Sequence, residues 1–367
     1  MPEEAVWANN NSLPIISLDW LKNQGIAVSI MTRRLNFPTL DPFLLALVGT
    51  VILASVLPAR GAALQVFDLV ADAAIMLLFF LHGAKLSREA IVSGLGNWRL
   101  HLMTLASTYV LFPVLGLGAA WAGGLVVDPA LATGLLFLAL LPSTVQSSIA
   151  FTAMAGGNVA AAVCSASLSN LLGIVLTPLL VTLFIHSGTS AGGDELASVQ
   201  KIATQLLLPF VTGHLLRPLI GKWIDRHKAL LLPVDRSSVL LVVYSAFSAA
   251  VANGVWQRVG ALDLAVLLVA SAAILAIVIG INAGAAKAAG LSREDAIVLL
   301  FCGSKKSLVS GVPMAGALFA PAQVGLVILP VMIFHQLQLF VCAWLAGRYR
   351  RQLDGQTATA QAAPAQG

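Results

Sequence analysis

Long apolar runs separated by short polar or charged segments dominate the chain from residue 39 onward. A helix needs roughly 20 mostly apolar residues to cross a bilayer, and ten runs bounded by proline, glycine or charge come close to this length. The pattern therefore predicts an all-α integral membrane protein with ten transmembrane helices. The predicted spans are residues 39–57, 64–83, 100–122, 130–155, 158–185, 199–219, 237–256, 262–285, 294–319 and 323–347.

The composition supports a membrane location. Hydrophobic residues make up 58% of the 367 residues and charged residues only 10%, whereas a soluble domain carries about 25% charged residues. The net charge of +5 does not indicate a nucleic-acid partner, because the basic residues lie at the ends of the predicted spans and form no contiguous face. The three cysteines lie in apolar runs without metal-ligand spacing, so we expect small buried side chains and no disulfide framework.

The positions of lysine and arginine predict the orientation. If the N-terminus is cytoplasmic, sixteen of the 21 basic residues lie on the cytoplasmic side and three lie outside. Such an excess is what the positive-inside rule requires. An odd number of spans would remove it, so we predict an even number, with both termini in the cytoplasm.

Five helices in each half place the two halves in opposite orientations, as in an inverted repeat. The chain then divides into an N-terminal cytoplasmic extension (1–36), a first five-helix repeat (37–185), a linker (186–200), a second five-helix repeat (201–347) and a C-terminal tail (348–367). The tail begins RYRRQ and ends in small and polar residues (QTATAQAAPAQG), so we expect it to be disordered.

The fourth and ninth spans correspond in such a repeat, and both contain helix breakers. Pro142 precedes a polar cluster, and Gly303, Gly311 and Pro313 bracket another. Proline removes a backbone donor and clashes with the preceding turn. Matched breaks favour a transport site, whereas the usual role of a single break is a kink. The candidate binding residues are Ser143, Thr144, Gln146, Ser147 and Ser148 in the fourth span and Ser304, Lys305, Lys306 and Ser307 in the ninth.

The two lysines are unusual for their depth. Lys305 is eleven residues from Glu294, or roughly 16 Å along a helix, which is near the middle of the bilayer. A charge there costs at least about 2.5 kcal/mol. We therefore expect at least one lysine to face a wet cavity and to supply positive charge for an anionic substrate. The alternative is that one or both side chains reach an interface.

Hydroxyl groups in the first cluster are suitable ligands for sodium or for a substrate carboxylate, and the start of the following half-helix adds partial positive charge. Contact between helices is the competing role of such residues in membranes, and we favour it for Ser165, Ser167, Ser169 and Asn170 in the fifth span. In the tenth span, His335 lies close to Gln338 and titrates in the range needed for a proton carrier. A hydrogen-bonded core histidine is an equally good interpretation.

Four segments resemble the bile acid:sodium symporter superfamily, and in particular its SBF-like branch, which contains bacterial relatives of the seventh member of the vertebrate solute carrier ten family. They are LHGAKLSREAI (81–91), LLPSTVQSSIAF (140–151) with the following GGN, FCGSKKSLVSGVPMA (301–315) and HQLQL (335–339). The resemblance implies a bacterial inner-membrane carrier with two inverted five-helix repeats. It also implies panel and core domains, with broken helices four and nine crossing in the core.

The resemblance also implies where sodium would bind. A sodium-binding Ser-Asn pair in the family corresponds to Ser147–Ser148, and a glutamine on the third helix corresponds to Thr108. The sodium-binding glutamate of the ninth helix corresponds to Phe301, and the Gln-Asn pair corresponds to Lys305–Lys306. Ser147–Ser148 stay candidates for sodium, but a nearby ammonium would repel the ion. We expect transport that is independent of sodium or linked to protons through a lysine or His335.

We therefore predict a secondary transporter that moves a small organic anion by alternating access within the lipid bilayer, without a cofactor other than its coupling ion. The alternatives are a membrane regulator of ion homeostasis that transports nothing itself, or a cation/proton antiporter. The antiporter normally needs a buried carboxylate pair, which the spans lack. An enzyme is not expected, because no P-loop, His/Cys metal constellation or G-x-S-x-G motif occurs. The pattern leaves the oligomeric state open.

Overall fold

The computed structural model describes residues 42–85, 97–186, 200 and 203–362, and every regular element within these ranges is a helix. The described helices belong to one compact unit that extends from Pro38 to Gly367. The predicted extension 1–36 lies outside the described residues, and so does the linker between 187 and 199.

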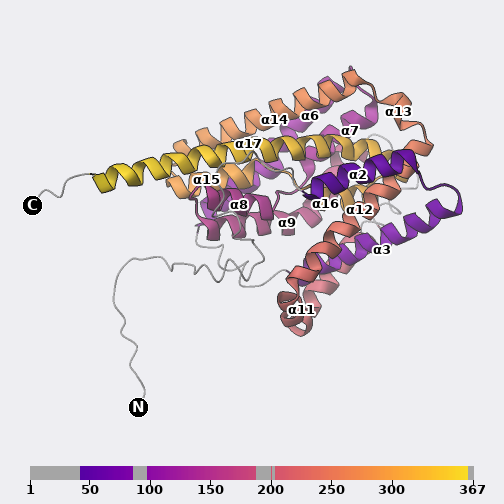
Figure 1. Cartoon of the computed structure of the whole chain (residues 1–367), viewed down its shortest axis with the longest axis horizontal. Coiled ribbons are helices and arrows are strands. Elements are labelled where there is room, and N and C mark those ends of the chain that lie inside the picture. Colours follow the sequence, from indigo (N-terminus) through magenta and orange to yellow (C-terminus); the bar gives the residue numbers. More distant parts are fainter. Residues whose placement is uncertain (1–41, 86–96, 187–199, 201–202, 363–367) are drawn as a thin grey trace, which may run out of the picture. The chain divides into compact units, whose positions relative to one another are not determined.

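The helices follow the predicted spans closely (Figure 1). The first half contains α2 (Pro42–Val56), α3 (Ala62–Lys85), α5 (Trp98–Ala106), the π-helix η3 (Ser107–Leu111), α6 (Phe112–Gly123), α7 (Pro129–Leu140), α8 (Gln146–Met154), α9 (Val159–Val181) and the π-helix η4 (Thr182–His186). The second half contains the π-helix η5 (Ala203–Leu207), α11 (Leu208–Arg226), α12 (Lys228–Ala252), α13 (Val255–Arg258), α14 (Ala261–Ala288), α15 (Arg293–Gly303), α16 (Leu308–Leu318) and α17 (Pro321–Ala362).

Length and composition make the chain a multi-pass membrane protein. Among the described residues, seven helices are long and apolar enough to cross a bilayer, and two shorter apolar helices cover Leu45–Val56 and Pro129–Leu140. The all-helical class is therefore confirmed. The count of ten spans and the inverted five-helix repeats stay predictions.

Side chains at helix starts explain several boundaries. Asp128 caps α7 by accepting a hydrogen bond from the Ala130 N–H at 2.8 Å, and Pro129 fills the first helical position, where no N–H is needed. Asn158 caps α9 in the same manner through the Ala161 N–H. These are favoured N-cap residues, because their side chains satisfy donors that the first turn leaves free.

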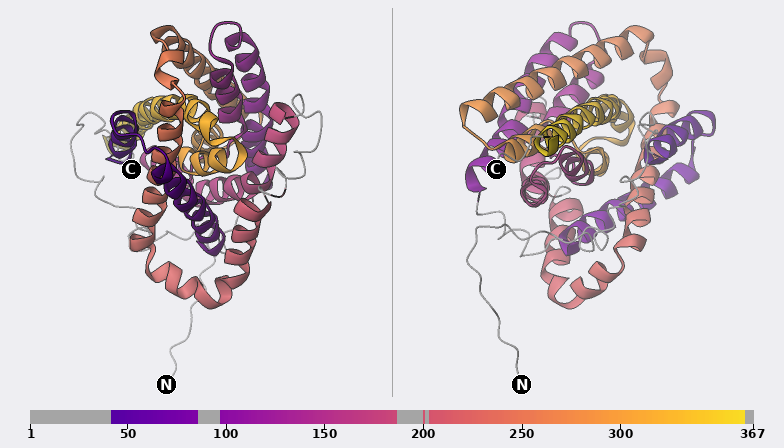
Figure 2. Two further views of the ribbon diagram at one scale, coloured as in Figure 1. Left: turned by 90° about the vertical axis from the view of Figure 1, so that its right-hand side faces the viewer. Right: turned by 60° about the vertical axis from the view of Figure 1, so that its left-hand side comes forward.

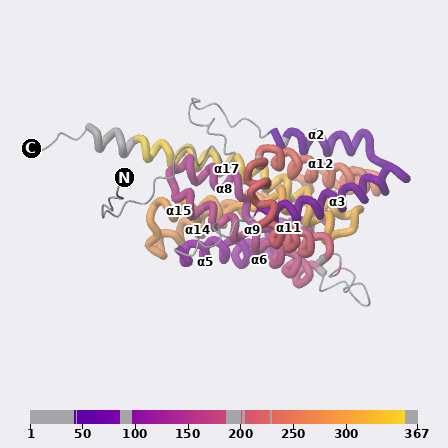
Figure 3. Tube along the Cα trace, turned by 90° about the horizontal axis from the view of Figure 1, so that it is seen from below, coloured from indigo at the N-terminus to yellow at the C-terminus, as the bar shows by residue number. Residues whose placement is uncertain are grey.

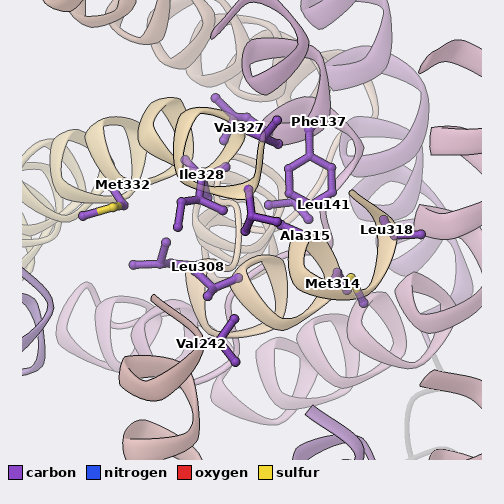
Figure 4. Packing of buried hydrophobic residues seen from close by; sticks show 14 of the residues in the cluster. Phe137, Leu141, Val242, Leu308, Met314, Ala315, Leu318, Val327, Ile328 and Met332 are labelled. Atoms are coloured by element: carbon purple, nitrogen blue, oxygen red, sulfur yellow. The ribbon is translucent and has the colours of Figure 1, made fainter. Parts of the chain in front are cut away.

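The core lies where α7, α12, α16 and α17 meet. Helix α17 packs on the other three helices, and the views in Figure 2 show it enclosed by its neighbours. Phe137 of α7, Val242 of α12, Met314 of α16 and Ile328 of α17 are buried in one apolar cluster (Figure 4). On another side of the unit, α3 packs on α11 and α12, while α2 packs on α12 (Figure 3).

The C-terminal tail was predicted incorrectly. Helix α17 continues past residue 347 to Ala362, so the segment expected to be disordered is helical as far as that residue. Two contacts support the extension. Arg293 of α15 donates to the Tyr349 carbonyl at 3.1 Å, and Arg350 pairs with Asp354 one turn later. The sequence composition reveals neither contact, and both involve residues between 349 and 354 of the tail.

Helices α3 and α11 cross at two glycines. A Cβ atom placed on Gly83 would overlap the Phe210 carbonyl, and one placed on Gly213 would overlap the Phe80 carbonyl. The contact is reciprocal, because each helix carries a phenylalanine three residues before its glycine. Only glycine lets the two backbones approach this closely.

We expect Gly83→Ala or Gly213→Ala to lower the melting temperature of the purified protein in detergent, since overpacking costs about 1–3 kcal/mol. Gly280→Ala in α14 is the matched control, because a Cβ there would meet no atom within 4 Å. Equal melting temperatures for the Gly83 and Gly280 variants would contradict the close crossing.

Candidate functional site

The first break interrupts the fourth predicted span. Helix α7 ends at Leu140 and α8 begins at Gln146. Leu141 has extended backbone angles, with φ −74° and ψ 156°, because the residue before a proline is pushed out of the α region. The break predicted at Pro142 is therefore present.

The second break interrupts the ninth predicted span between Gly303 and the start of α16. Ser307 is the N-cap of α16 and accepts a hydrogen bond from the Ser310 N–H at 3.2 Å. Pro313, expected to bracket the break, lies inside α16 instead. The N-cap serine restarts the helix before the proline is reached, so the break contains only Ser304, Lys305, Lys306 and Ser307.

The two breaks contact each other. The Ser307 N–H donates to the Pro142 carbonyl at 2.8 Å. The Ser143 hydroxyl donates to the Cys302 carbonyl at 2.6 Å, and the Ser148 hydroxyl donates to the Phe301 carbonyl at 3.1 Å. Candidate residues separated by about 160 positions in sequence therefore lie together, with serines of the first break capping the end of α15.

Two more serines complete this cap. Ser107 donates to the Gly303 carbonyl at 2.8 Å, and Ser304 donates to the Leu300 carbonyl. The last four carbonyls of α15 thus all accept from serine hydroxyls. Ser107 was not among the predicted site residues, because a lone serine in an apolar helix carries no distinguishing signal.

Lys306 caps the end of α7 with a full charge. Its Nζ donates to the carbonyls of Thr108 (2.9 Å), Ala139 (2.8 Å) and Leu141 (2.7 Å), and the side chain is 0% exposed. Three N–H groups meet three acceptors, so the ammonium is fully satisfied. The negative end of the α7 dipole stabilises it further. We call these three carbonyls the carbonyl cage.

A proline makes the Thr108 carbonyl available. In η3 the Phe112 N–H donates to the Ser107 carbonyl, five residues earlier. The equivalent donor for Thr108 would be residue 113, but Pro113 has no N–H. The family resemblance placed the Thr108 side chain in the site. In the structure the Thr108 carbonyl binds the Lys306 ammonium. The Thr108 hydroxyl instead donates to the Thr104 carbonyl within the helix.

Gln338 fixes the main chain of Lys306. Its Oε1 accepts from the Lys306 N–H at 2.8 Å, and its Nε2 donates to the Lys306 carbonyl at 2.8 Å. The same Nε2 donates to His335 Nδ1 at 2.9 Å. His335 and Gln338 thus lie beside the second break, and their visible role is to hold the backbone of the break.

Lys305 contrasts with Lys306. Its Nζ is also 0% exposed, but it has no hydrogen-bond acceptor among the described residues. The ammonium lies over the ring of Phe151 at 4.0 Å and near that of Phe301 at 5.7 Å. Cation–π contacts supply about 0.5–2 kcal/mol, which is less than the several kcal/mol that burying a charge costs.

The expectation that a lysine faces a wet cavity is wrong for this conformation. Both ammonium groups are fully buried, since carbonyls surround Lys306 and aromatic rings cover Lys305. Neither reaches an interface, so the alternative is excluded as well. The accessible part of the first break is the start of α8, where Gln146 is exposed and Ser147 is half-buried.

The hydroxyls proposed for sodium bind one another. Ser147 donates to Thr144 at 2.9 Å, and the Thr144 and Ser148 hydroxyls share a hydrogen bond of 2.8 Å. Hard cations prefer carboxylate and carbonyl oxygens, but Phe301 supplies no carboxylate. Within the described ranges, no group of three His, Cys, Asp or Glu side chains could hold a metal ion.

Helix α9 contributes more than the sequence indicated. Asn170 donates to the Ser143 carbonyl at 2.6 Å and accepts from the Ser310 hydroxyl at 3.0 Å, which links the two broken helices. Thr177 donates to the Leu140 carbonyl at 2.8 Å. The sequence favours helix packing for Asn170, whereas the structure places it between the two breaks. Its spacing from the first break gives no hint that it joins both breaks.

Comparison with known proteins places these residues in a family context. A family model described as the SBF-like CPA transporter family matches residues 41–351, which include both breaks. The chain is 55% identical over 318 residues to protein YfeH of Escherichia coli (strain K12), covering 87% of this chain and 95% of that relative. It is 53% identical over 324 residues to protein PA2026 of Pseudomonas aeruginosa, covering 88% and 97% respectively. Sodium/bile acid cotransporter 7 of Danio rerio is 27% identical over 330 residues, with 84% and 95% covered.

The two lysines should respond differently to replacement. Lys306→Met leaves three buried carbonyls without donors, at about 1–3 kcal/mol each, so we expect a large fall in melting temperature in detergent. Lys305→Met loses no hydrogen bond and removes an unpaired buried amine, so its melting temperature should equal or exceed that of wild type. Equal destabilisation by both substitutions would disprove the assigned contacts.

Proposed function

The chain belongs to the SBF-like CPA transporter family, as its motifs predicted, and from this premise we propose that it moves a small organic anion across the bacterial inner membrane without sodium. The protein is a multi-pass membrane transporter. Our proposal adds alternating access between panel and core domains, with both termini in the cytoplasm. It also adds two inverted five-helix repeats, residues 37–185 and 201–347, joined by the linker 186–200.

One observation carries the proposal. The Lys306 ammonium occupies the carbonyl cage, where the three oxygens and the end of α7 would otherwise suit a monovalent cation. A second unit charge 4 Å away would be repelled by about 4 kcal/mol at an effective dielectric of 20. A covalently attached cation therefore replaces a bound ion, and the family resemblance implies that Phe301 takes the position of the sodium-binding glutamate.

The positive charge at the breaks favours an anionic substrate. Two lysines lie within the broken segment, and none of the Asp or Glu side chains in the described spans lies in either break. We propose that the anion binds at the start of α8, where Gln146 and Ser147 are accessible. The N–H groups of the first turn have no helical partners and point toward that position. The absence of a buried carboxylate pair in the breaks argues against a cation/proton antiporter.

A thermal-shift screen of small carboxylates tests this function. We expect at least one carboxylate to raise the melting temperature of wild type equally in sodium chloride and choline chloride. Gln146→Ala or Ser147→Ala should weaken the shift about tenfold in ligand concentration, since charge-assisted hydrogen bonds contribute roughly 1.5–3 kcal/mol. Gln257→Ala, an exposed glutamine on α13, is the control. A shift that requires sodium and disappears in Ser147→Ala would overturn the proposal.

The carbonyl cage gives a second test. Lys306→Ala should empty the cage and create a site for a free cation. We expect sodium or ammonium chloride to raise the melting temperature of this variant above its value in choline chloride, because choline is too large for the cage. Wild type and Lys305→Ala should show no such difference. A Lys306→Ala variant that melts identically in all three salts would contradict a built-in cation.

A further inference from the structure

The neighbouring lysines differ in a way that the proposed function does not use. Lys306 has three acceptors and needs its charge to hold the carbonyl cage. Lys305 has no acceptor among the described residues, although its Nζ is completely buried. An amine held in this manner loses no hydrogen bond when its proton leaves, whereas Lys306 would lose one.

Among the described residues, no carboxylate acts on Lys305. The titratable groups that act on it are two buried thiols, Cys302 of α15 and Cys342 of α17. Helix α8, which covers the amine with Phe151, has no titratable side chain. The other titratable groups on the elements packed against this region are His101 on α5, Cys164 on α9, Asp263 and Lys287 near the two ends of α14, Glu294 and Asp295 at the start of α15, and His335, Tyr349 and Asp354 on α17. The arginines on these elements are Arg99, Arg293, Arg348, Arg350 and Arg351.

Three of those groups have hydrogen-bond partners other than Lys305. His101 hydrogen-bonds Ser165, and His335 hydrogen-bonds Gln338. Asp295 accepts from two asparagines at the opposite end of α15, eight residues before Gly303 and so roughly 12 Å away along the helix. A buried charge needs a partner or must be neutralised. Lys305 becomes neutral when it loses one proton.

From these contacts we propose that Lys305 is the site of an exchangeable proton, and that this proton is the ion coupled to transport. The coupling of this proton to transport rests on the proposed function, whereas the exchange of the proton at Lys305 does not. Phe151 lies on α8, which is bounded by the first break and by Gly156, whose φ is +74°. Displacement of α8 would expose the amine to water, which supplies acceptors for the protonated form. The proton would pass to this water before α8 returned, so the amine would be neutral when it was buried again.

The test compares the pH dependence of thermal unfolding for the full chain in detergent, from pH 5.5 to 9.5. In the folded protein a protonated Lys305 lacks acceptors that water supplies after unfolding, so acid should destabilise wild type more than Lys305→Met. We expect the ratio of their unfolding constants to change by up to tenfold per pH unit, the limit for one proton. Lys222→Met, at an exposed lysine of α11, should parallel wild type.

Lys305→Arg keeps a permanent charge, so its profile should run parallel to that of Lys305→Met at a lower melting temperature. Coincident pH profiles for wild type and Lys305→Met would overturn the proposal, whichever way their absolute stabilities differ. That failure would leave sodium-independent transport standing, because the salt response of Lys306→Ala reports on a different residue and a different cation.

Discussion

The structure of the site depends on satisfying carbonyl groups where two helices stop inside the protein. A helix that ends in the bilayer leaves up to four carbonyls without donors, and no lipid can supply them. At the end of α7, the Lys306 ammonium satisfies Ala139 and Leu141, while Thr177 satisfies Leu140. Each of these three carbonyls has a donor, so the break is a stable structure and not a local unfolding.

The two helix ends solve the same problem with different chemistry. Serine hydroxyls, which are neutral, cap the last carbonyls of α15. An ammonium caps α7, and it also draws in the Thr108 carbonyl that Pro113 leaves free. Exchange of donors between the halves, with Ser143 serving α15 and Lys306 serving α7, makes each break depend on the other. A change at one break therefore reaches the second through hydrogen bonds of the main chain.

The positions of the two breaks could be predicted from the sequence, but the hydrogen bonds within them could not. Pro142 and the polar clusters identified both segments, because backbone chemistry at proline is local. The depth of Lys305 could also be estimated from helix rise. The hydrogen-bond partners of Lys306 could not be predicted, since they are main-chain carbonyls. The side chains of residues such as Ala139 do not indicate that their carbonyls accept from a lysine. The same limit explains the helical tail: the contact from Arg293 to the Tyr349 carbonyl depends on packing that composition does not encode.

Lys306 has three hydrogen-bond acceptors and the neighbouring Lys305 has none among the described residues. This difference suits a carrier in which one positive charge is permanent and the other is gained and lost as a proton. If both lysines were bonded, the breaks would be rigid and no group could change state without breaking the cage. If neither were bonded, the end of α7 would lack donors. Burial alone does not separate these cases, because both side chains are 0% exposed. The number of acceptors separates them, and it assigns Lys306 to the scaffold and Lys305 to the part of the cycle in which charge changes.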